Sequence, residues 1–256
     1  DQFNEEAEAE SDADPQVLVC ALQVLVIPML QKVLVGCQDS SEAMDAAQAS
    51  LDEDLIDSFV SDVLDPADED DKTIYSETLR VQLLQLSTLL IRNLPEDLVK
   101  HRKELIKFGW NHLKRDESSS KQWAFVNVSY FLQAYQAPEK IILQVFVALL
   151  RACQPEQAEL VTEALDALTP ALPIRLSQGD HKYPIWIRYT KKSLVEDGHT
   201  FPQLVHIWNL ISRHSKFFYS SRAQFVPQMV NSLSRLGLPT SSSQASRSLS
   251  IDLVEL

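Results

Sequence analysis

Three histidines near the C-terminal end are the residues whose spacing comes closest to a metal site. His199, His206 and His214 lie seven and eight residues apart, so two of them can share one face of a helix. A zinc site needs three or four protein ligands, and no carboxylate or thiol accompanies these histidines at ligand spacing. The histidines therefore predict no metal centre.

Motifs that carry common enzymatic chemistry are missing from the sequence. It contains no phosphate-binding glycine loop, no dinucleotide-binding glycine pattern, no H-E-x-x-H pair and no paired C-x-x-C. HRKE (101–104) shares only its first two letters with a kinase catalytic loop and lacks the catalytic aspartate. The serines at 241–243 have no base partner, and we interpret them as helix-capping residues. We expect no enzyme, no catalytic residue and no cofactor.

A cluster of basic and aromatic residues between 185 and 222 is the strongest candidate for function. In the simplest interpretation it is a solvated charged face above an aromatic core. In the functional hypothesis it is a docking surface for an acidic, hydrophobic peptide. Nucleic acid is disfavoured because the net charge of the chain is −13. The members of this basic–aromatic cluster are Arg188, Lys191, Lys192, Trp208, Arg213, Lys216, Phe217, Phe218, Tyr219 and Arg222.

Helices must position these residues, because apolar side chains recur at helical spacing through most of the chain. The clearest stretch is 121–176, which predicts three consecutive helices separated by two or three residues. The middle helix, 140–151, is apolar nearly all round and therefore needs neighbours on at least two sides. Two prolines fall inside predicted helices. Pro28 lies in the helix that begins at Pro15 and is expected to kink it, and Pro227 is internal to a helix expected over 219–236.

The spacing of the predicted helices indicates a repeat architecture. From residue 73 to residue 241 a helix starts about every 21 residues, so a helix pair takes about 42, as in HEAT and armadillo repeats. The scarcity of glycine, with five residues, fits an all-helical chain. We predict an all-α fold, an α-solenoid of HEAT-like antiparallel helix pairs over 72–256 that is a fragment of a longer array. A compact helical bundle is the alternative.

Charge divides the chain into parts. Residues 1–71 contain 20 acidic residues and a single basic one, whereas residues 72–256 contain 16 acidic and 22 basic residues. A segment with one sign of charge and few apolar residues cannot bury enough surface to fold alone. We expect an acidic tail at 1–14, a solenoid helix at 15–37 and a mobile acidic loop at 38–71, with a short helix at 55–64.

Cysteines and the N-terminal region bear on cellular location. Cys20, Cys37 and Cys153 are odd in number and far apart, which indicates free thiols in a reducing compartment. The acidic N-terminus does not resemble a signal peptide. Residues 17–35 are apolar enough to raise the possibility of a membrane span, but Pro28 and Lys32 interrupt the run. A buried solenoid helix is the favoured interpretation of this stretch.

Five stretches of the second half carry a family resemblance. The most specific is VEDGHTFPQLVHI (195–207), because helix amphipathicity alone does not dictate it. The others are KIILQVFVALLRA (140–152), ALTPALPIRL (167–176), SRLGL (234–238) and SIDLVEL (250–256). Together they resemble the transcription-coactivator pseudokinases of the phosphatidylinositol-3-kinase-related family, TRRAP in animals and Tra in fungi.

The resemblance implies a fold and a role. It implies part of the HEAT-repeat solenoid that precedes the family's FAT and kinase-like domains, so no active-site residue can be carried over. It implies a nuclear, non-catalytic scaffold in histone acetyltransferase complexes of the SAGA and NuA type. Expected partners are acidic transcription activation domains and other subunits, without a small-molecule substrate, a membrane or direct nucleic-acid contact. The alternatives are a HEAT-type scaffold for nuclear transport or a phosphatase, and a structural spacer with no partner site.

Overall fold

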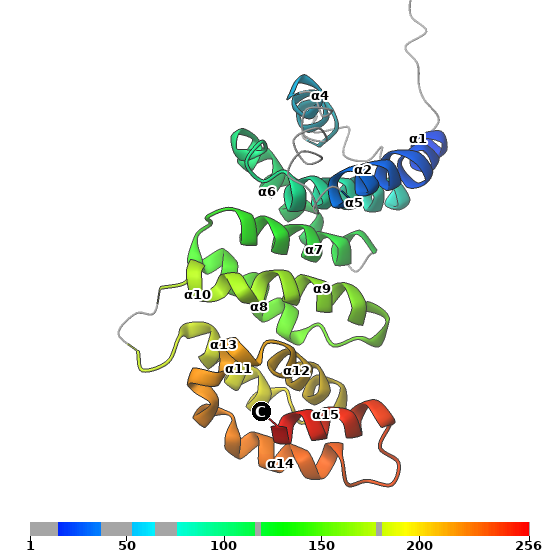
Figure 1. Cartoon of the computed structure of the whole chain (residues 1–256). Helices are drawn as coiled ribbons and strands as arrows, with labels where there is room; N and C mark the ends of the chain where they lie inside the picture. The colour runs from blue at the N-terminus through cyan, green and yellow to red at the C-terminus, as the bar shows by residue number, and fades with distance from the viewer. Residues whose placement is uncertain (1–14, 37–52, 65–75, 116–118, 178–180, 256) are drawn as a thin grey trace, which may run out of the picture. The chain divides into compact units, whose positions relative to one another are not determined.

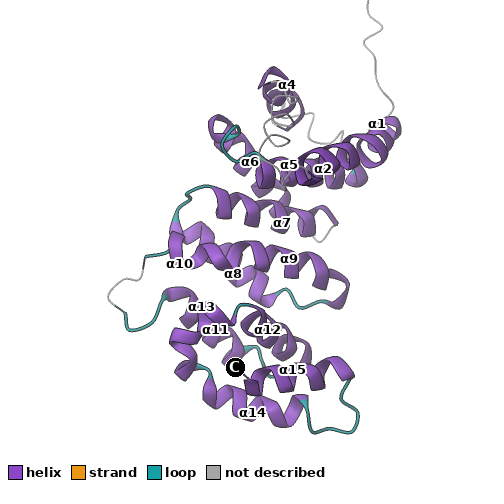
Figure 2. Ribbon diagram, viewed as in Figure 1, coloured by secondary structure: helices purple, strands orange, loops and turns teal. Residues whose placement is uncertain are grey.

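The structure is a computed structural model that describes residues 15–36, 53–64, 76–115, 119–177 and 181–255. Throughout these ranges the chain forms helices and the turns between them, with no strand (Figure 2). The all-α fold class is therefore confirmed. The chain divides into two compact units, residues 1–123 and 124–256, and the boundary falls within helix α7 (Ser119–Ala134).

The first unit begins with a long helix that changes its winding before Pro28. The helix is built from α1 (Pro15–Ala21), the π-helical turn η1 (Leu22–Val26) and α2 (Ile27–Gly36). Proline cannot donate a backbone hydrogen bond and its ring crowds the carbonyl four residues earlier. The wider π turn, closed by a bond from Ile27 N–H to Leu22 O, lies directly before that position. The expected distortion therefore takes the form of a π turn.

One face of this N-terminal helix packs on α5 (Glu77–Asn93). Leu22, Ile27 and Leu34 are buried, as a solenoid helix requires. By length and composition, Gln16–Leu34 also meets the criteria for a membrane span, and only 17% of its most apolar window is buried. Several apolar side chains remain exposed along it, namely Val17, Leu18, Val24, Leu25 and Met29.

The described part of the acidic segment is helical and packed. The helix expected at 55–64 corresponds to α4 (Glu53–Ser58) and the π turn η2 (Phe59–Leu64), which contacts α6 (Arg102–Leu113). Ile56, Val60 and Leu64 are buried. These turns are therefore part of unit 1, whereas the rest of the proposed loop and the tail at 1–14 lie outside the described residues.

An ion pair connects α4 to the residues that lead into α6. Lys100 Nζ lies 2.7 Å from Asp57 Oδ1, and His101 Nε2 lies 2.7 Å from the same oxygen. These hydrogen bonds lower the pKa of Asp57 below its ordinary value. A carboxylate of α4 thus pairs with the charge of Lys100 and contacts His101 in η4 (Val99–His101), which leads into α6.

Side-chain caps define the ends of the helices around α5. Ser76 Oγ accepts a hydrogen bond from Leu79 N–H at 3.3 Å, which makes it the N-cap of α5. Glu77, in the first turn of α5, accepts bonds from the backbone N–H and the hydroxyl of Ser120. A carboxylate is favourable there because Ser120 lies in the first turn of α7 and helix N-termini carry partial positive charge.

The second unit is layered around α8 (Glu139–Arg151). Five of its apolar side chains are buried, and it contacts α9, α10, α11 and α12, which confirms that the most apolar predicted helix has neighbours on several sides. Figure 1 shows α8 and α9 side by side, with α11 and α12 in the next layer. The other elements are η5 (Pro155–Gln157), α9 (Ala158–Leu168), η6 (Thr169–Ala171), α10 (Leu172–Arg175), α11 (Ile185–Glu196), α12 (Phe201–Arg213), α13 (Ser215–Phe218), η7 (Tyr219–Gln224), α14 (Val226–Leu236) and α15 (Gln244–Glu255).

Polar side chains join successive helices by satisfying the carbonyl groups at helix ends. Gln203 donates to the carbonyl oxygen of Leu150, and His206 donates to that of Leu149 at 3.0 Å. Both carbonyls belong to the last turn of α8, where intrahelical partners run out. Arg175 serves the end of α7 in the same way, with bonds to the carbonyls of Gln133 and Ala134.

The helix predicted over 219–236 is wrong in one respect, because it is not continuous. Residues Tyr219–Gln224 form the 3-10 turn η7, and α14 begins at Val226. Pro227 therefore lies in the first turn of α14 instead of inside a longer helix. At that position the missing N–H has no intrahelical acceptor to lose, so proline starts the helix and causes no kink. Helix α14 packs on α15, which also contacts α12.

Candidate functional site

Buried aromatic rings form the base of the basic–aromatic cluster. Phe218, on α13, contacts Trp186 of α11 at 5.1 Å between ring centroids and Phe225 at 5.8 Å, both edge to face. Such geometry stabilises aromatic packing beyond the burial of area. Phe218 is itself buried, so its ring belongs to the core and holds α11 against α13.

Trp208 also belongs to the interior. It lies on α12, and only 1% of its surface is exposed. Its indole Nε1 has no hydrogen-bond acceptor among the residues that the structure describes. Phe217 is half-buried beside the ring of His214, whereas Tyr219 is 55% exposed. Of the four aromatic residues that sequence reasoning chose, Tyr219 is thus the one that is largely open to solvent.

The cations of α11 differ in their surroundings. Lys191 Nζ donates to Gln224 Oε1 at 3.0 Å, which ties α11 to η7. Lys192 Nζ lies 3.9 Å from Glu196 Oε1, one turn along the same helix. The side chain of Arg188 is exposed and has no hydrogen-bond or ion-pair partner within the described part of the chain. Lys216, on α13, is in the same situation.

Arg213 is engaged in a contact that the sequence did not reveal. Its Nε donates to Asp166 Oδ1 of α9 at 3.1 Å, and His214 Nε2 lies 2.7 Å from the same oxygen. Because the partner lies 47 residues away, no local pattern pointed to it. Arg213 therefore joins the end of α12 to α9.

Arg222 lies against the exposed tyrosine. Its guanidinium carbon is 4.0 Å from the centroid of the Tyr219 ring, a cation–π distance, and Nη1 donates to the backbone oxygen of Tyr219 at 3.0 Å. No carboxylate pairs with Arg222 among the residues that the structure describes. Its charge is held in place and remains open to an anionic partner.

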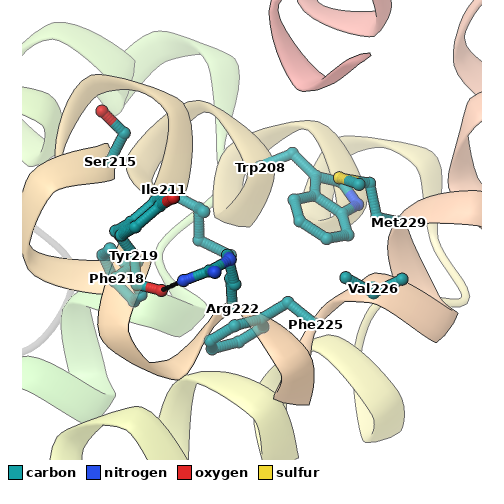
Figure 3. A pocket seen from close by; sticks show the side chains of 9 residues that line it. All are labelled: Trp208, Ile211, Ser215, Phe218, Tyr219, Arg222, Phe225, Val226 and Met229. Carbon is teal, nitrogen blue, oxygen red and sulfur yellow. Dashed lines mark hydrogen bonds between the residues drawn. The ribbon is translucent and has the colours of Figure 1, made fainter. Parts of the chain in front are cut away.

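Arg222 and Trp208 line the same pocket, shown in Figure 3. The pocket has a volume of about 80 Å³ and lies between α12, α13, η7 and the start of α14. Sequence reasoning identified four of its residues and missed the others, because an apolar residue at helical spacing looks the same whether it faces a core or a pocket. The lining residues are Trp208, Ile211, Ser215, Phe218, Tyr219, Arg222, Phe225, Val226 and Met229.

The charge around this pocket has one sign over a long stretch of sequence. Residues 198–251 contain five Lys or Arg residues and no Asp or Glu. All four elements that line the pocket, α12, α13, η7 and α14, belong to this stretch. The pocket is therefore built from an acid-free part of an otherwise acidic chain.

The three C-terminal histidines have separate structural contacts. His199 Nδ1 bonds to the carbonyl of Glu196, His206 to Leu149 O and His214 to Asp166. Burial lowers the pKa of His206 below its ordinary value, against the opposing effect of the Leu149 hydrogen bond. Among the described residues, no three His, Cys, Asp or Glu side chains are grouped so that they could hold a metal ion.

Comparison with known families identifies the chain. Residues 6–256 match the family model described as "Tra1 HEAT repeat ring region". The chain belongs to this family. The Tra1 assignment confirms the resemblance found in the second half, extends it to the first half, and confirms the HEAT-like α-solenoid over the compact bundle.

Curated relatives agree with the Tra1 assignment. The chain is 43% identical over 237 residues, 93% of its length, to "Probable transcription-associated protein 1" of Dictyostelium discoideum. It is 35% identical over 208 residues, 77% of its length, to human "Transformation/transcription domain-associated protein". It is 32% identical over 182 residues, 71% of its length, to "SAGA complex/NuA4 acetyltransferase complex subunit TRA1" of Saccharomyces cerevisiae. In each case the chain spans about 5% of the relative's length.

Proposed function

We propose that this Tra1 segment is a non-catalytic scaffold in a nuclear histone acetyltransferase coactivator, and that it helps recruit the complex through transcription activators. A relative named as a SAGA and NuA4 acetyltransferase subunit supports the scaffold role. The observation that carries the recruitment role is the exposed charge of Arg222 against the ring of Tyr219, together with two exposed cations on α11 and α13, Arg188 and Lys216, whose side chains have no partner among the described residues. Membership of the Tra1 family leaves no support for a nuclear-transport or phosphatase scaffold.

The chemistry of this face complements acidic activation domains. Such domains are disordered chains in which carboxylates alternate with bulky apolar residues. Cations steer the encounter, and an aromatic or apolar surface supplies the affinity that survives added salt. Lys191 and Lys192 add positive charge at α11, although each already has a local partner. Trp208 and Phe218 support the surface from the core, and Arg213 holds the end of α12 to Asp166 of α9.

Binding at this site should be weak and sensitive to salt. Each exposed ion pair contributes only about 0.2–1 kcal/mol, and ordering a disordered peptide costs free energy at the moment of binding. Two or three such pairs with a small apolar contact correspond to a dissociation constant in the micromolar range or above. Raising ionic strength from about 0.05 M to 0.5 M should weaken binding several-fold, because screening shortens the reach of exposed charges.

The test is a titration of a fluorescent acidic activation-domain peptide at these two ionic strengths. Arg188→Glu/Lys216→Glu changes two cations that have no partner in the described residues and should weaken binding at low salt at least about tenfold. The matched control is Lys103→Glu/Lys140→Glu, which reverses two exposed cations on α6 and α8 with the same change in net charge.

Equal binding by the wild type and Arg188→Glu/Lys216→Glu would remove this site from the proposal. Equal weakening by both double variants would reduce the effect to net charge alone. Absence of binding by the wild-type chain would leave the structural spacer as the function of this segment.

A further inference from the structure

The pocket beside Arg222 contains a polar group that the fold leaves unsatisfied. Trp208 Nε1 is buried and has no acceptor within the described part of the chain, although buried donors in folded proteins nearly always have one. Figure 3 shows the indole nitrogen on the side of the ring toward Met229. Met229 lines the same pocket, and its flexible thioether can move aside more readily than a branched side chain. A backbone carbonyl oxygen of a peptide whose side chain enters the pocket would supply the acceptor.

The size of the pocket limits what can enter. Its volume is about 80 Å³. An engineered protein cavity of about 150 Å³ accepts benzene, so this pocket is too small for an aromatic ring without rearrangement. The lining is mostly apolar, with Phe218, Phe225, Ile211 and Val226 around Trp208. An aliphatic side chain of the size of Leu, Ile or Met fits these limits.

The positive charge at the edge of the pocket favours apolar ligands that carry a neighbouring carboxylate. Arg222 lines it, and Lys191 is bonded to Gln224, two residues further along η7. The surrounding sequence from 198 to 251 contributes no carboxylate that could repel an acidic partner. A carboxylate next to the inserted side chain would therefore meet a positively charged edge.

We propose that this pocket anchors one aliphatic side chain of an acidic peptide, with a neighbouring carboxylate of that peptide on Arg222. The inference rests on the proposed recruitment function and specifies its ligand: a segment with Leu, Ile or Met next to Asp or Glu. Specificity for aliphatic residues comes from the pocket, and preference for acidic segments comes from Arg222 and from Arg188 and Lys216, whose side chains have no partner in the described ranges.

The first test fills the pocket without changing any charge. Val226→Phe places a ring at a lining position that is 43% exposed and so tolerates a larger side chain. Val230→Phe makes the same exchange one turn further along α14, at an exposed position that does not line the pocket.

The probe is a synthetic peptide in which Leu alternates with Asp and Glu. Val226→Phe should weaken binding about tenfold or more, the loss expected when one aliphatic side chain is no longer buried. Val230→Phe should bind within about twofold of the wild type.

A second filling variant guards against a folding defect. Ser215→Leu fills the pocket from α13 and should weaken the same peptide, with wild-type circular dichroism and thermal unfolding. If both folded filling variants bind the peptide as the wild type does, the proposal is overturned.

The second test observes the pocket directly. The indole N–H of Trp208 gives one cross-peak in a ¹H–¹⁵N spectrum, assigned by its loss in Trp208→Phe. The Leu peptide should shift this cross-peak, and a peptide of the same charge with Ala in place of Leu should not. A cross-peak that stays in place at saturating Leu peptide would overturn the anchor.

Comparison of the Leu peptide with the Ala peptide also distinguishes failure of the aliphatic anchor from failure of the proposed function. If the Leu and Ala peptides bind equally and salt weakens both, the charged docking face stands and the anchor fails. If neither peptide binds the wild type, both fail. If a Trp-containing peptide of equal charge binds more tightly than the Leu peptide, the aliphatic specificity is wrong.

Discussion

His214 Nε2 lies 2.7 Å from Asp166 Oδ1, although the two residues are 48 positions apart. The same oxygen accepts a hydrogen bond from Arg213. One carboxylate on α9 thus fixes both the last residue of α12 and the residue that follows it, directly before α13. This contact holds in place the chain segment that begins the wall of the pocket.

Replacing Asp166 with Ala should lower the free energy of unfolding by about 0.5–1.5 kcal/mol. The carboxylate is partly exposed, so its contribution is that of a screened ion pair with hydrogen bonds and not that of a buried one. Urea unfolding monitored by circular dichroism measures the change. Glu159→Ala, at an exposed position on the same helix, is the matched control and should change stability by less than about 0.5 kcal/mol. Equal effects of the two substitutions would contradict a structural role for the Asp166 contact.

Phe146→Ala should be among the most destabilising single substitutions in the second unit. The ring is fully buried in α8, which has helices on several sides, so neighbouring side chains cannot all move in to close the cavity. We expect a loss of about 3–5 kcal/mol, seen as a lower urea midpoint. Ile174→Ala removes an apolar side chain that is 80% exposed and should cost less than about 0.5 kcal/mol. A small effect at Phe146 would mean that α8 is not the centre of this unit.

Stability should fall as the pH decreases below about 6.5. Burial is the main cause that lowers the pKa of His112 and of His206 below the ordinary value of 6.5. Both are then neutral in the folded chain at a pH where the unfolded chain binds protons, so acid favours unfolding. The stability is present in full above the unfolded pKa and is lost as pH falls below it.

The measurement for this pH dependence is the urea midpoint at pH 7.5 and at pH 5.5. The wild type should have the lower midpoint at pH 5.5. The difference should become smaller in His112→Gln and in His206→Gln, because glutamine keeps a donor for the carbonyl that each histidine contacts and does not titrate. Midpoints that do not change with pH in the wild type would contradict the prediction.

The 256-residue chain should self-associate with increasing concentration. Ile251 and Val254 are both exposed and lie three residues apart on α15, and further apolar side chains are exposed along Gln16–Leu34 of the first unit. Side chains three residues apart lie on the same face of a helix, and exposed apolar patches mark interaction sites. Sedimentation velocity should show a concentration-dependent shift that decreases in Ile251→Gln/Val254→Gln.

Ile174→Gln is the control for self-association, because it removes one exposed apolar residue of the same unit from a different helix. It should leave the shift unchanged. A monodisperse wild-type monomer at high concentration would contradict an apolar interaction face on α15.

Much of the fold could be predicted because its signals are local. The apolar face and the proline at the start of α8 are properties of consecutive residues, so periodicity identified the helix and its need for several neighbours. The helix at 55–64 could be predicted in the same way, from apolar residues within an acidic stretch. The helix over 219–236 was wrongly predicted as continuous, because the sequence does not show whether the turn before Pro227 continues as α-helix or ends so that the proline starts a new helix.

The candidate site was predicted in composition and only partly in geometry. The sequence by itself determined the all-helical class, the family, and the presence of cations and aromatic rings between 185 and 222, because helix periodicity and charge are carried by neighbouring residues. Only the tertiary structure decided that Arg213 pairs with Asp166, that Phe218 belongs to the core, and that Trp208 lines a pocket with its N–H unsatisfied. Each of these depends on which helix packs opposite, and partners 30 to 50 residues away leave no mark in local spacing.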